Sequence, residues 1–293
     1  MIKPYPQFFP LEKTDKPEFD RAFKDSPPEI SECTFTNLYS WRETYGFQVS
    51  AMDEALILRF ETKNKSGFFY PFGISYPEKL IKTILAEAGG SFYRLPEKLA
   101  FLFADDPVYA LEEDTDNADY LYQAGDLIDL PGRKYDGKRN QIKKFKSQHR
   151  YEYKKLEGIN VRECLEFEET WCTIKNCDSV EGLSQERLAI NQMVNSCVSF
   201  NLRAAAIRID GKISAVAIAE KLNPDTLVMH ILKADPNIPG LYQVMINDFL
   251  ANEAKDVLFV NLEQDLGIEG LRKSKLSYHP LRMVKKYTLR KIK

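Results

Sequence analysis

The run from residue 202 to residue 254 limits the possible folds more than any other part of the chain. Two apolar segments, 202–210 and 212–222, are joined by Asp210-Gly211, which is typical of a tight β-hairpin turn. Asn223-Pro224-Asp225 then turns the chain into a third apolar segment, 226–235. The pattern predicts three antiparallel strands in a meander. A loop at 236–240 and a helix at 241–254 follow.

The remaining segments predict further helices and strands. In the second half we expect a helix at 184–200, a strand at 256–263, a helix at 267–278 and a last strand at 281–291. In the first half we expect helices at 34–45, 77–90 and 97–103 and strands at 47–52, 54–60, 66–72 and 108–114. This mixture predicts an α+β fold whose sheets are mixed, mostly antiparallel and flanked by helices.

Length and charge divide the chain into two domains. At about 150 residues per domain, 293 residues suggest two. Residues 105–130 carry nine acids and no Lys or Arg, whereas residues 133–155 carry ten bases and two acids, and Pro131-Gly132 separates them. We therefore predict an N-terminal domain at 1–132, a basic connecting helix at 133–156 and a C-terminal domain at 157–293.

The basic segment 134–156 is the first candidate binding surface. Wound as a helix, it presents a cationic face beside an apolar face. The cations are Arg139, Lys143, Lys146, Arg150 and Lys154, and the apolar residues are Tyr135, Ile142, Phe145, Tyr153 and Leu156. The whole chain has a net charge of −2, so this positive charge is local. The segment is either an anion-binding surface or an ordinary solvated helix.

Composition indicates a globular protein, since 44% of the residues are hydrophobic and 12% aromatic. No apolar run approaches the roughly 20 residues of a membrane span, and the N-terminus lacks a signal-peptide pattern. We therefore expect a cytoplasmic location. The five cysteines are expected to be reduced thiols. The sequence contains no CxxC pair and no Cys/His cluster that would predict a metal site.

The loop 233–240 is the first candidate ligand site. Free backbone N–H groups and the positive end of the following helix meet there, which suits a pyrophosphate or a carboxylate. Asn237, Gly240 and Tyr242 are the candidate contacts. An ordinary turn between a strand and a helix remains the alternative, because Pro and Gly are common in such turns.

The segment 261–280 is the candidate for chemistry. Glu263, Asp265 and Glu269 follow a strand, at the end where ligands usually bind to open α/β sheets. One of these carboxylates would accept a proton from an attacking amine or hydroxyl, and Tyr278 would return a proton to the leaving group. Helix capping and intrahelical ion pairs are the alternative roles of these acids.

Other candidates favour structural roles. His230 alternates with Val228 and Leu232 in a strand, where a core or sheet-surface histidine is the more common finding. The aromatic residues of 34–45 favour core packing over base stacking. The sequence contains no Ser–His–Asp set, P-loop or dinucleotide fingerprint.

Four segments together resemble a known family. They are TFTNLYSWR (34–42), KYDGKRNQIKKFK (134–146), KADPNIPGLYQ (233–243) and DLGIEGLRKSKLSYHP (265–280). They resemble an uncharacterised bacterial family similar to the C-terminal catalytic domain of phosphatidylglycerol lysyltransferases. The resemblance spans nearly the whole chain and implies two tandem acyltransferase domains of the Gcn5-related type.

The resemblance also implies a function, the transfer of an acyl or aminoacyl group from an activated donor to an amine or a hydroxyl. The donor would be aminoacyl-tRNA or acyl-CoA, the acceptor a small molecule or a peptide, and no cofactor would be tightly bound. Carried over by position, Lys138, Arg139, Lys143 and Lys146 would contact the anionic donor. The residues near the transfer site would be Asp265, Glu269, Arg272 and Lys275.

Two alternatives stay open. The chain would be a non-catalytic module that binds tRNA or another polyanion through the basic helix, with the steep salt dependence that phosphate contacts produce. It would otherwise be an ordinary acetyl-CoA-dependent N-acetyltransferase.

Overall fold

The computed structural model describes residues 2–155, 161–177 and 182–292, which form two compact units. The first unit contains the residues up to Tyr120, together with Gln264–Lys273 and the residues from Arg282 onward. The second contains Leu121–Glu263 and Ser274–Leu281. The units therefore differ from the predicted division in chain order, because two C-terminal segments belong to the first unit. The boundary predicted after residue 156 lies outside the described residues.

The sheet of the first unit has the strand order β1-β2-β3-β4-β5-β14-β6. Only β4 and β5 are parallel among its paired strands. The strands are β1 (Phe9–Pro10), β2 (Gln48–Met52), β3 (Ala55–Glu61), β4 (Ser66–Phe69), β5 (Ser91–Pro96), β6 (Tyr109–Glu113) and β14 (Lys286–Lys291). The helices are η1 (Lys13–Asp15), α1 (Lys16–Asp25), α2 (Phe35–Tyr45), α3 (Glu78–Glu87), α4 (Glu97–Ala100), η2 (Phe101–Phe103) and η3 (Thr115–Asn117).

Local sequence explains the bounds of α2. Thr34 caps its N-terminus, because the Thr34 hydroxyl oxygen accepts a hydrogen bond from the backbone N–H of Asn37 at 3.1 Å. Gly46 ends the helix in the left-handed conformation, with φ of 60°. A Cβ at this position would lie 2.5 Å from the carbonyl oxygen of Glu61, so the close approach of β3 requires glycine.

A buried lysine anchors β14, the last strand, in the first unit. Lys286 is fully buried, and its Nζ lies 2.5 Å from Glu32 Oε2 and 2.6 Å from Asp119 Oδ1. Burial alone lowers the pKa of Lys286, but the two carboxylates outweigh this effect and raise the pKa above its usual value. The last strand is thus held in this sheet by an ion cluster as well as by its ladder of backbone hydrogen bonds.

The second sheet has the strand order β13-β7-β12-β11-β10-β9-β8. The strands are β7 (Asp119–Gln123), β8 (Tyr151–Lys155), β9 (Arg203–Ile209), β10 (Lys212–Asn223), β11 (Thr226–Ala234), β12 (Phe259–Asn261) and β13 (Arg282–Val284). The helices of this part of the chain are α5 (Ala124–Asp129), η4 (Arg133–Tyr135), α6 (Asp136–Gln148), α7 (Val161–Lys175), α8 (Leu183–Ser196), α9 (Leu241–Glu253) and α10 (Glu269–Leu276).

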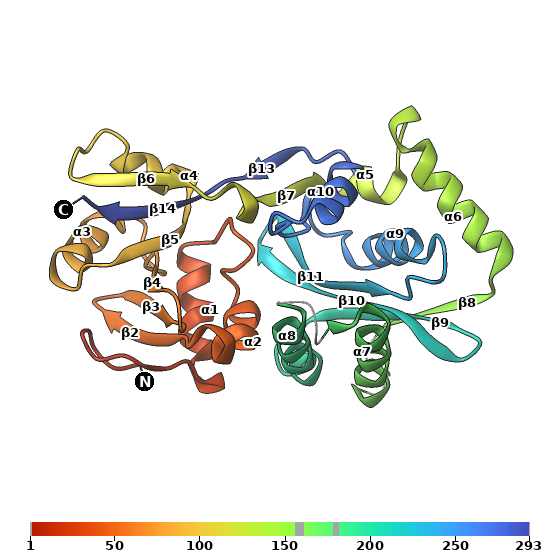
Figure 1. Cartoon of the computed structure of the whole chain (residues 1–293), viewed down its shortest axis with the longest axis horizontal. Helices are drawn as coiled ribbons and strands as arrows, with labels where there is room; N and C mark the ends of the chain where they lie inside the picture. The colour runs from red at the N-terminus through yellow and green to blue at the C-terminus, as the bar shows by residue number, and fades with distance from the viewer. Residues whose placement is uncertain (1, 156–160, 178–181, 293) are drawn as a thin grey trace. The chain divides into compact units, whose positions relative to one another are not determined.

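The predicted meander forms the centre of this sheet. Strands β9, β10 and β11 pair antiparallel in sequence order. Asp210 and Gly211, with φ of 51° and 79°, make the hairpin turn that the dipeptide predicts. Helix α9 covers one face of these strands, and α7 and α8 lie on the opposite face (Figure 1). The predicted fold class, mixed α/β with two mostly antiparallel sheets flanked by helices, is confirmed.

Two predicted elements differ from the observed ones. The basic helix ends at Gln148, and residues 151–155 form β8, which pairs with β9. Alternation explains the strand, since Tyr151 and Tyr153 are partly buried while Glu152 and Lys154 are exposed. The predicted last strand divides into β13 and β14. Leu156 lies outside the described residues.

Candidate active site

In the second sheet, β11 is paired with its neighbour β12 over only part of its length. Strand β12 runs parallel to β11, but the two pair only from Thr226 opposite Phe259 to Val228 opposite Asn261. Strand β11 continues beyond this pairing to Ala234 and leads through a loop into α9 (Figure 1). The later part of β11 therefore has an edge that β12 does not cover, directly before the N-terminus of a helix.

Glycine shapes the start of α9. Gly240 precedes the helix with φ of 86°, and a Cβ there would lie 2.8 Å from the Gln141 carbonyl oxygen and 3.1 Å from Phe145 Cβ, both in α6. In the first turn, the backbone N–H groups of Tyr242 and Gln243 have no acceptor among the described residues. Two donors and the positive end of a 13-residue helix thus remain available to an anion.

A cavity of about 320 Å³ adjoins these donors. Its wall is formed by the end of β11, the loop after it, the start of α9, and Trp171 and Lys175 of α7. Trp171 Nε1 donates a hydrogen bond of 3.1 Å to the carbonyl oxygen of Ala234, which fixes α7 to the strand. Lys175 is exposed and has no carboxylate partner among the described residues, so its charge is available to a ligand.

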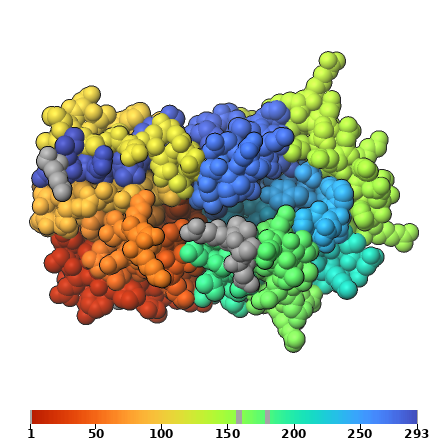
Figure 2. Space-filling model, in the orientation of Figure 1, coloured from red at the N-terminus to blue at the C-terminus, as the bar shows by residue number. Residues whose placement is uncertain are grey.

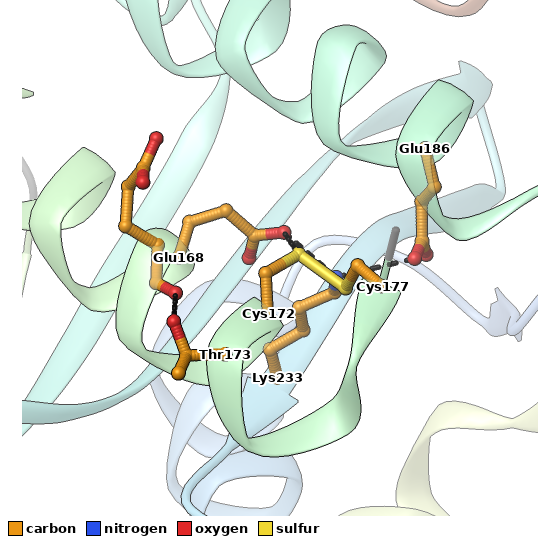
Figure 3. The surroundings of a disulfide bond; sticks show 7 residues. Glu168, Cys172, Thr173, Cys177, Glu186 and Lys233 are labelled. Carbon is orange, nitrogen blue, oxygen red and sulfur yellow. Dashed lines mark hydrogen bonds and ion pairs between the residues drawn. A yellow bond between two sulfur atoms is a disulfide. The ribbon is translucent and has the colours of Figure 1, made fainter. Parts of the chain in front are cut away.

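The other lysine of the cavity, Lys233, is already paired. Its Nζ lies 2.9 Å from Glu168 Oε1 and 3.1 Å from Glu186 Oε2 (Figure 3). The same Nζ lies 3.8 Å from the centre of the Trp171 ring. Burial raises the pKa of Glu168 against the opposing effect of Lys233. This cluster holds the wall of the cavity together and leaves no cationic charge for a ligand.

A disulfide lies beside this cluster. Cys172 and Cys177 are joined, with Cα atoms 5.0 Å apart, so the expectation of reduced thiols is wrong for this pair (Figure 3). The reason is local, because Cys172 lies in the last turn of α7 and the chain turns directly after the helix to bring Cys177 beside it. The thiols of Cys33, Cys164 and Cys197 are free and buried, as expected.

His230 lies in β11 between two carboxylates. Its Nδ1 is 2.7 Å from Glu263 Oε1, and its Nε2 is 2.9 Å from Glu220 Oε1. Burial lowers the pKa of His230, but the hydrogen bonds to both glutamates outweigh it and raise the pKa to about 10. His230 is therefore an imidazolium at neutral pH. It orients Glu263, which follows β12 in the left-handed conformation with φ of 59°.

Asp265 belongs to the first unit and is held on all sides. Arg272 contacts both carboxylate oxygens, at 2.9 and 3.1 Å, the Tyr120 hydroxyl donates at 2.5 Å, and the Gly267 N–H donates at 2.8 Å. The bonds from Arg272 lower the pKa of Asp265 to about 2. Arg272 also contacts Asp116 at 3.0 Å. The Asp265 carboxylate and the Arg272 guanidinium are therefore paired with each other.

Tyr278, in contrast, has an unused hydroxyl. The residue is 3% exposed, and its hydroxyl oxygen has no hydrogen-bond partner among the described residues. Burial raises its pKa, so the proton stays on the phenol. The Tyr135 hydroxyl donates to the Tyr278 carbonyl oxygen at 2.9 Å. Lys138 Nζ lies 3.9 Å from the centre of the Tyr278 ring and 2.7 Å from Ser277 Oγ. Burial lowers the pKa of Lys138.

The predicted cations of α6 differ in availability. Arg139 pairs with Asp136 and donates to the Gly132 carbonyl oxygen, and Lys146 pairs with Asp248 at 3.0 Å. Lys143 is exposed and has no carboxylate partner in the described part of the chain. Figure 2 shows α6, in yellow-green, on the outside of the second unit.

Three predicted residues have local roles. Lys275 Nζ donates to the Leu262 carbonyl oxygen at 2.6 Å. The Asn237 N–H donates to Asp235 Oδ1 at 2.9 Å, which shapes the loop before α9. Glu269 is the first residue of α10, where its charge favours the positive end of the helix.

Sequence reasoning missed the contribution of α7 to the cavity. Trp171, Lys175 and Glu168 lie far in sequence from the loop that they contact, and no helix at 161–175 is predicted above. Their signal was the amphipathic spacing of Cys164, Glu168 and Cys172, which are the buried residues of this helix.

Known proteins show what this arrangement is similar to. Residues 23–290 match the family described as phosphatidylglycerol lysyltransferase, C-terminal. The chain belongs to this family. The predicted resemblance is thus confirmed over most of the sequence.

Solved structures share the fold of this chain. A conserved protein of unknown function from Bacteroides thetaiotaomicron is 30% identical, with full coverage of both chains and a TM-score of 0.90. The L-PGS of Bacillus licheniformis shares the fold at 15% identity, with 88% of this chain and 92% of that chain covered and a TM-score of 0.62.

A relative known from sequence is more distant. The uncharacterized protein MYCGA3080 of Mycoplasmoides gallisepticum is 23% identical over 179 residues, which is 60% of this chain. The match spans 57% of the length of that curated relative. In the present chain, none of the helices that the structure describes is long and apolar enough to cross a membrane.

Proposed function

We propose that the chain transfers an acyl or aminoacyl group from an activated donor to an amine or a hydroxyl, at the open edge of β11. The observation that carries this proposal is the position of that edge, which ends at the free N–H groups of α9. Membership of the lysyltransferase family supports the reaction class.

The anionic part of the donor would bind at the start of α9. The backbone N–H groups of Tyr242 and Gln243 would donate to phosphate oxygens, and Lys175 would supply the counter-charge. The reacting carbonyl would then lie along β11 beyond Val228. Backbone N–H groups on this edge would stabilise the oxyanion of the tetrahedral intermediate.

Two side chains of the second unit would move the protons. Glu263 would accept a proton from the attacking amine or hydroxyl while its nitrogen or oxygen forms a bond to the carbonyl carbon. The bond from that carbon to the donor's oxygen or sulfur then breaks, and the Tyr278 hydroxyl would protonate the leaving atom. His230 would stay protonated and position Glu263.

Asp265 has a different role in this proposal. A carboxylate with a pKa of about 2 and four hydrogen bonds is a weak base, and its partners leave no room for a substrate proton. We assign Asp265 and Arg272 to the support of the 264–273 segment. Glu269 is exposed at the start of α10 and has no role in the proposed proton transfers.

We favour aminoacyl-tRNA over acyl-CoA as the donor. The exposed cations of α6 would add contacts to a long polyanion that a small thioester would not reach. Because Gly240 has no side chain, α6 packs closely against the start of α9. The cationic helix therefore lies next to the helix start that borders the cavity.

Transfer of label from donor to acceptor tests the proposal. The full chain would be incubated with radiolabelled aminoacyl-tRNAs, and separately with labelled acyl-CoAs, in the presence of a panel of amines and alcohols. We expect Glu263→Gln to lower kcat at least about 100-fold. Glu152→Gln, which changes an exposed carboxylate of β8, is the matched control and should leave kcat unchanged.

A polyanion-binding module without catalysis is the second candidate. It is favoured by Lys143, Lys144 and Arg150, which are exposed and have no carboxylate partner among the described residues. Salt-sensitive tRNA binding that is lost in Lys143→Glu/Arg150→Glu, without turnover of any donor, would support this candidate over the enzyme.

A further inference from the structure

The cavity beside α9 has a wall that is closed by a covalent bond. The disulfide between Cys172 and Cys177 forms a ring that contains Thr173, Ile174, Lys175 and Asn176. Lys175, the cation of the cavity that has no carboxylate partner in the described ranges, therefore lies inside this ring. The bond thus constrains the backbone that carries Lys175.

The residues that the disulfide encloses lie at the protein surface. Residues 173–176 are all exposed, and α7 ends at Lys175. Asn176 follows α7 in the left-handed conformation, with φ of 54°, as is common for the residue that ends a helix. Because helix ends fray readily, a covalent bond across this last turn limits the movement of the backbone that carries Lys175.

The bond also adjoins the ion cluster of the cavity wall. Cys172 Sγ lies 3.7 Å from Glu168 Oε1, the same oxygen that accepts from Lys233 Nζ (Figure 3). A disulfide sulfur has no proton to donate, whereas a thiol does. Reduction would thus give Glu168 a second donor and weaken its hold on Lys233 and, through Lys233, on Trp171.

We propose that the Cys172–Cys177 pair is a redox-controlled clamp on the anion site of the cavity. A dithiol reductant breaks the sulfur–sulfur bond, supplies two electrons and two protons to give two thiols, and is itself oxidised to a disulfide. The oxidised protein holds Lys175 at the rim and binds the anion more tightly. The reduced protein releases the end of α7 and binds it more weakly.

Burial limits how the clamp is opened. Cys172 is 4% exposed and Cys177 is 2% exposed, so a reductant reaches the sulfurs only when the end of α7 opens. Redox sensing is the usual role of disulfides in proteins of reducing compartments. The proposal concerns the donor site of the proposed function and rests on it.

Binding of inorganic pyrophosphate tests the clamp without any transfer reaction. Trp171 lies in the cavity wall, so its fluorescence in a Trp41→Phe background reports occupancy. We expect the dissociation constant to rise about fivefold after treatment with dithiothreitol, the effect of losing one exposed ion contact. Mass spectrometry of alkylated protein would verify the thiol state in each sample.

Variants separate the clamp from general changes in stability. Cys172→Ser/Cys177→Ser should bind like the reduced protein under both conditions. Lys175→Ala should bind weakly with no redox response, whereas Lys24→Ala, which changes an exposed lysine of α1, should keep the full response. Equal affinity in the oxidised and reduced wild type, or no pyrophosphate binding in either state, would overturn the proposal. Redox-dependent binding without acyl transfer would reject only the proposed function.

Discussion

The histidine of β11 gives the chain a pH-dependent stability that can be calculated. His230 has a fully buried side chain and contacts Glu220 and Glu263. Its pKa rises from 6.5 to about 10 on folding. Because the raised value means that the folded state binds the proton more tightly, the stabilisation is complete below pH 6.5. It is lost as the pH rises through about 10.

The size of the effect follows from the same values. A rise from 6.5 to about 10 corresponds to about 5 kcal/mol, at about 1.4 kcal/mol for each pKa unit. This is a large part of the stability of an ordinary domain, which is about 5–15 kcal/mol. We therefore expect His230→Gln, which removes the positive charge between two carboxylates, to destabilise the protein strongly at pH 6.5 and only slightly near pH 10.

Urea unfolding of both proteins between pH 6 and pH 10 measures this difference. Other groups titrate in this range, but they are common to the wild type and the variant and cancel in the comparison. NMR titration of the imidazole gives the pKa independently. A difference in unfolding free energy that stays constant with pH, or an imidazole that titrates near pH 6.5, would show that the two glutamates do not hold the proton on His230.

Three further variants test the rest of the structure. Lys286→Met leaves Asp119 buried without its cation and should reduce the free energy of unfolding by about 3–5 kcal/mol, measured by urea titration, whereas Lys286→Met/Asp119→Asn should recover part of it. Asp265→Asn should destabilise by about 1–3 kcal/mol through the lost bonds to Arg272 and leave kcat within about threefold, so a large loss of kcat would return Asp265 to the chemistry. Gly240→Ala should lower Tm and weaken pyrophosphate binding, because its Cβ meets α6 and its φ is positive; unchanged binding would contradict the described loop.

Local sequence signals were sufficient for the central elements. The meander of β9, β10 and β11 was predictable because Asp210-Gly211 and the Asn223–Asp225 turn fix its corners, and apolar strands lie between them. Helix α2 was predictable because Thr34 and Gly46 mark its two ends. These elements depend on contacts within a few residues.

Long-range pairing was beyond sequence reasoning. Nothing in the sequence near residues 286–291 indicates that this strand joins the first sheet. The two partners of Lys286 are Glu32, 254 residues away, and Asp119, 167 residues away. The site shows the same limit. His230 carried no sign of its two glutamates, and Glu263 could be named as a carboxylate after a strand but not as the partner of an imidazolium.

The most direct test of the proposed active site is donor-dependent transfer by the wild type and by Glu263→Gln. Labelled aminoacyl-tRNA is offered with a panel of amine and hydroxyl acceptors, and stable product is counted after hydrolysis of the remaining donor. We expect product with the wild type and a loss of about 100-fold or more with Glu263→Gln. Transfer that is undiminished in Glu263→Gln would contradict the proposed site. No transfer from aminoacyl-tRNA or acyl-CoA, with salt-sensitive tRNA binding intact, would contradict the proposed enzyme.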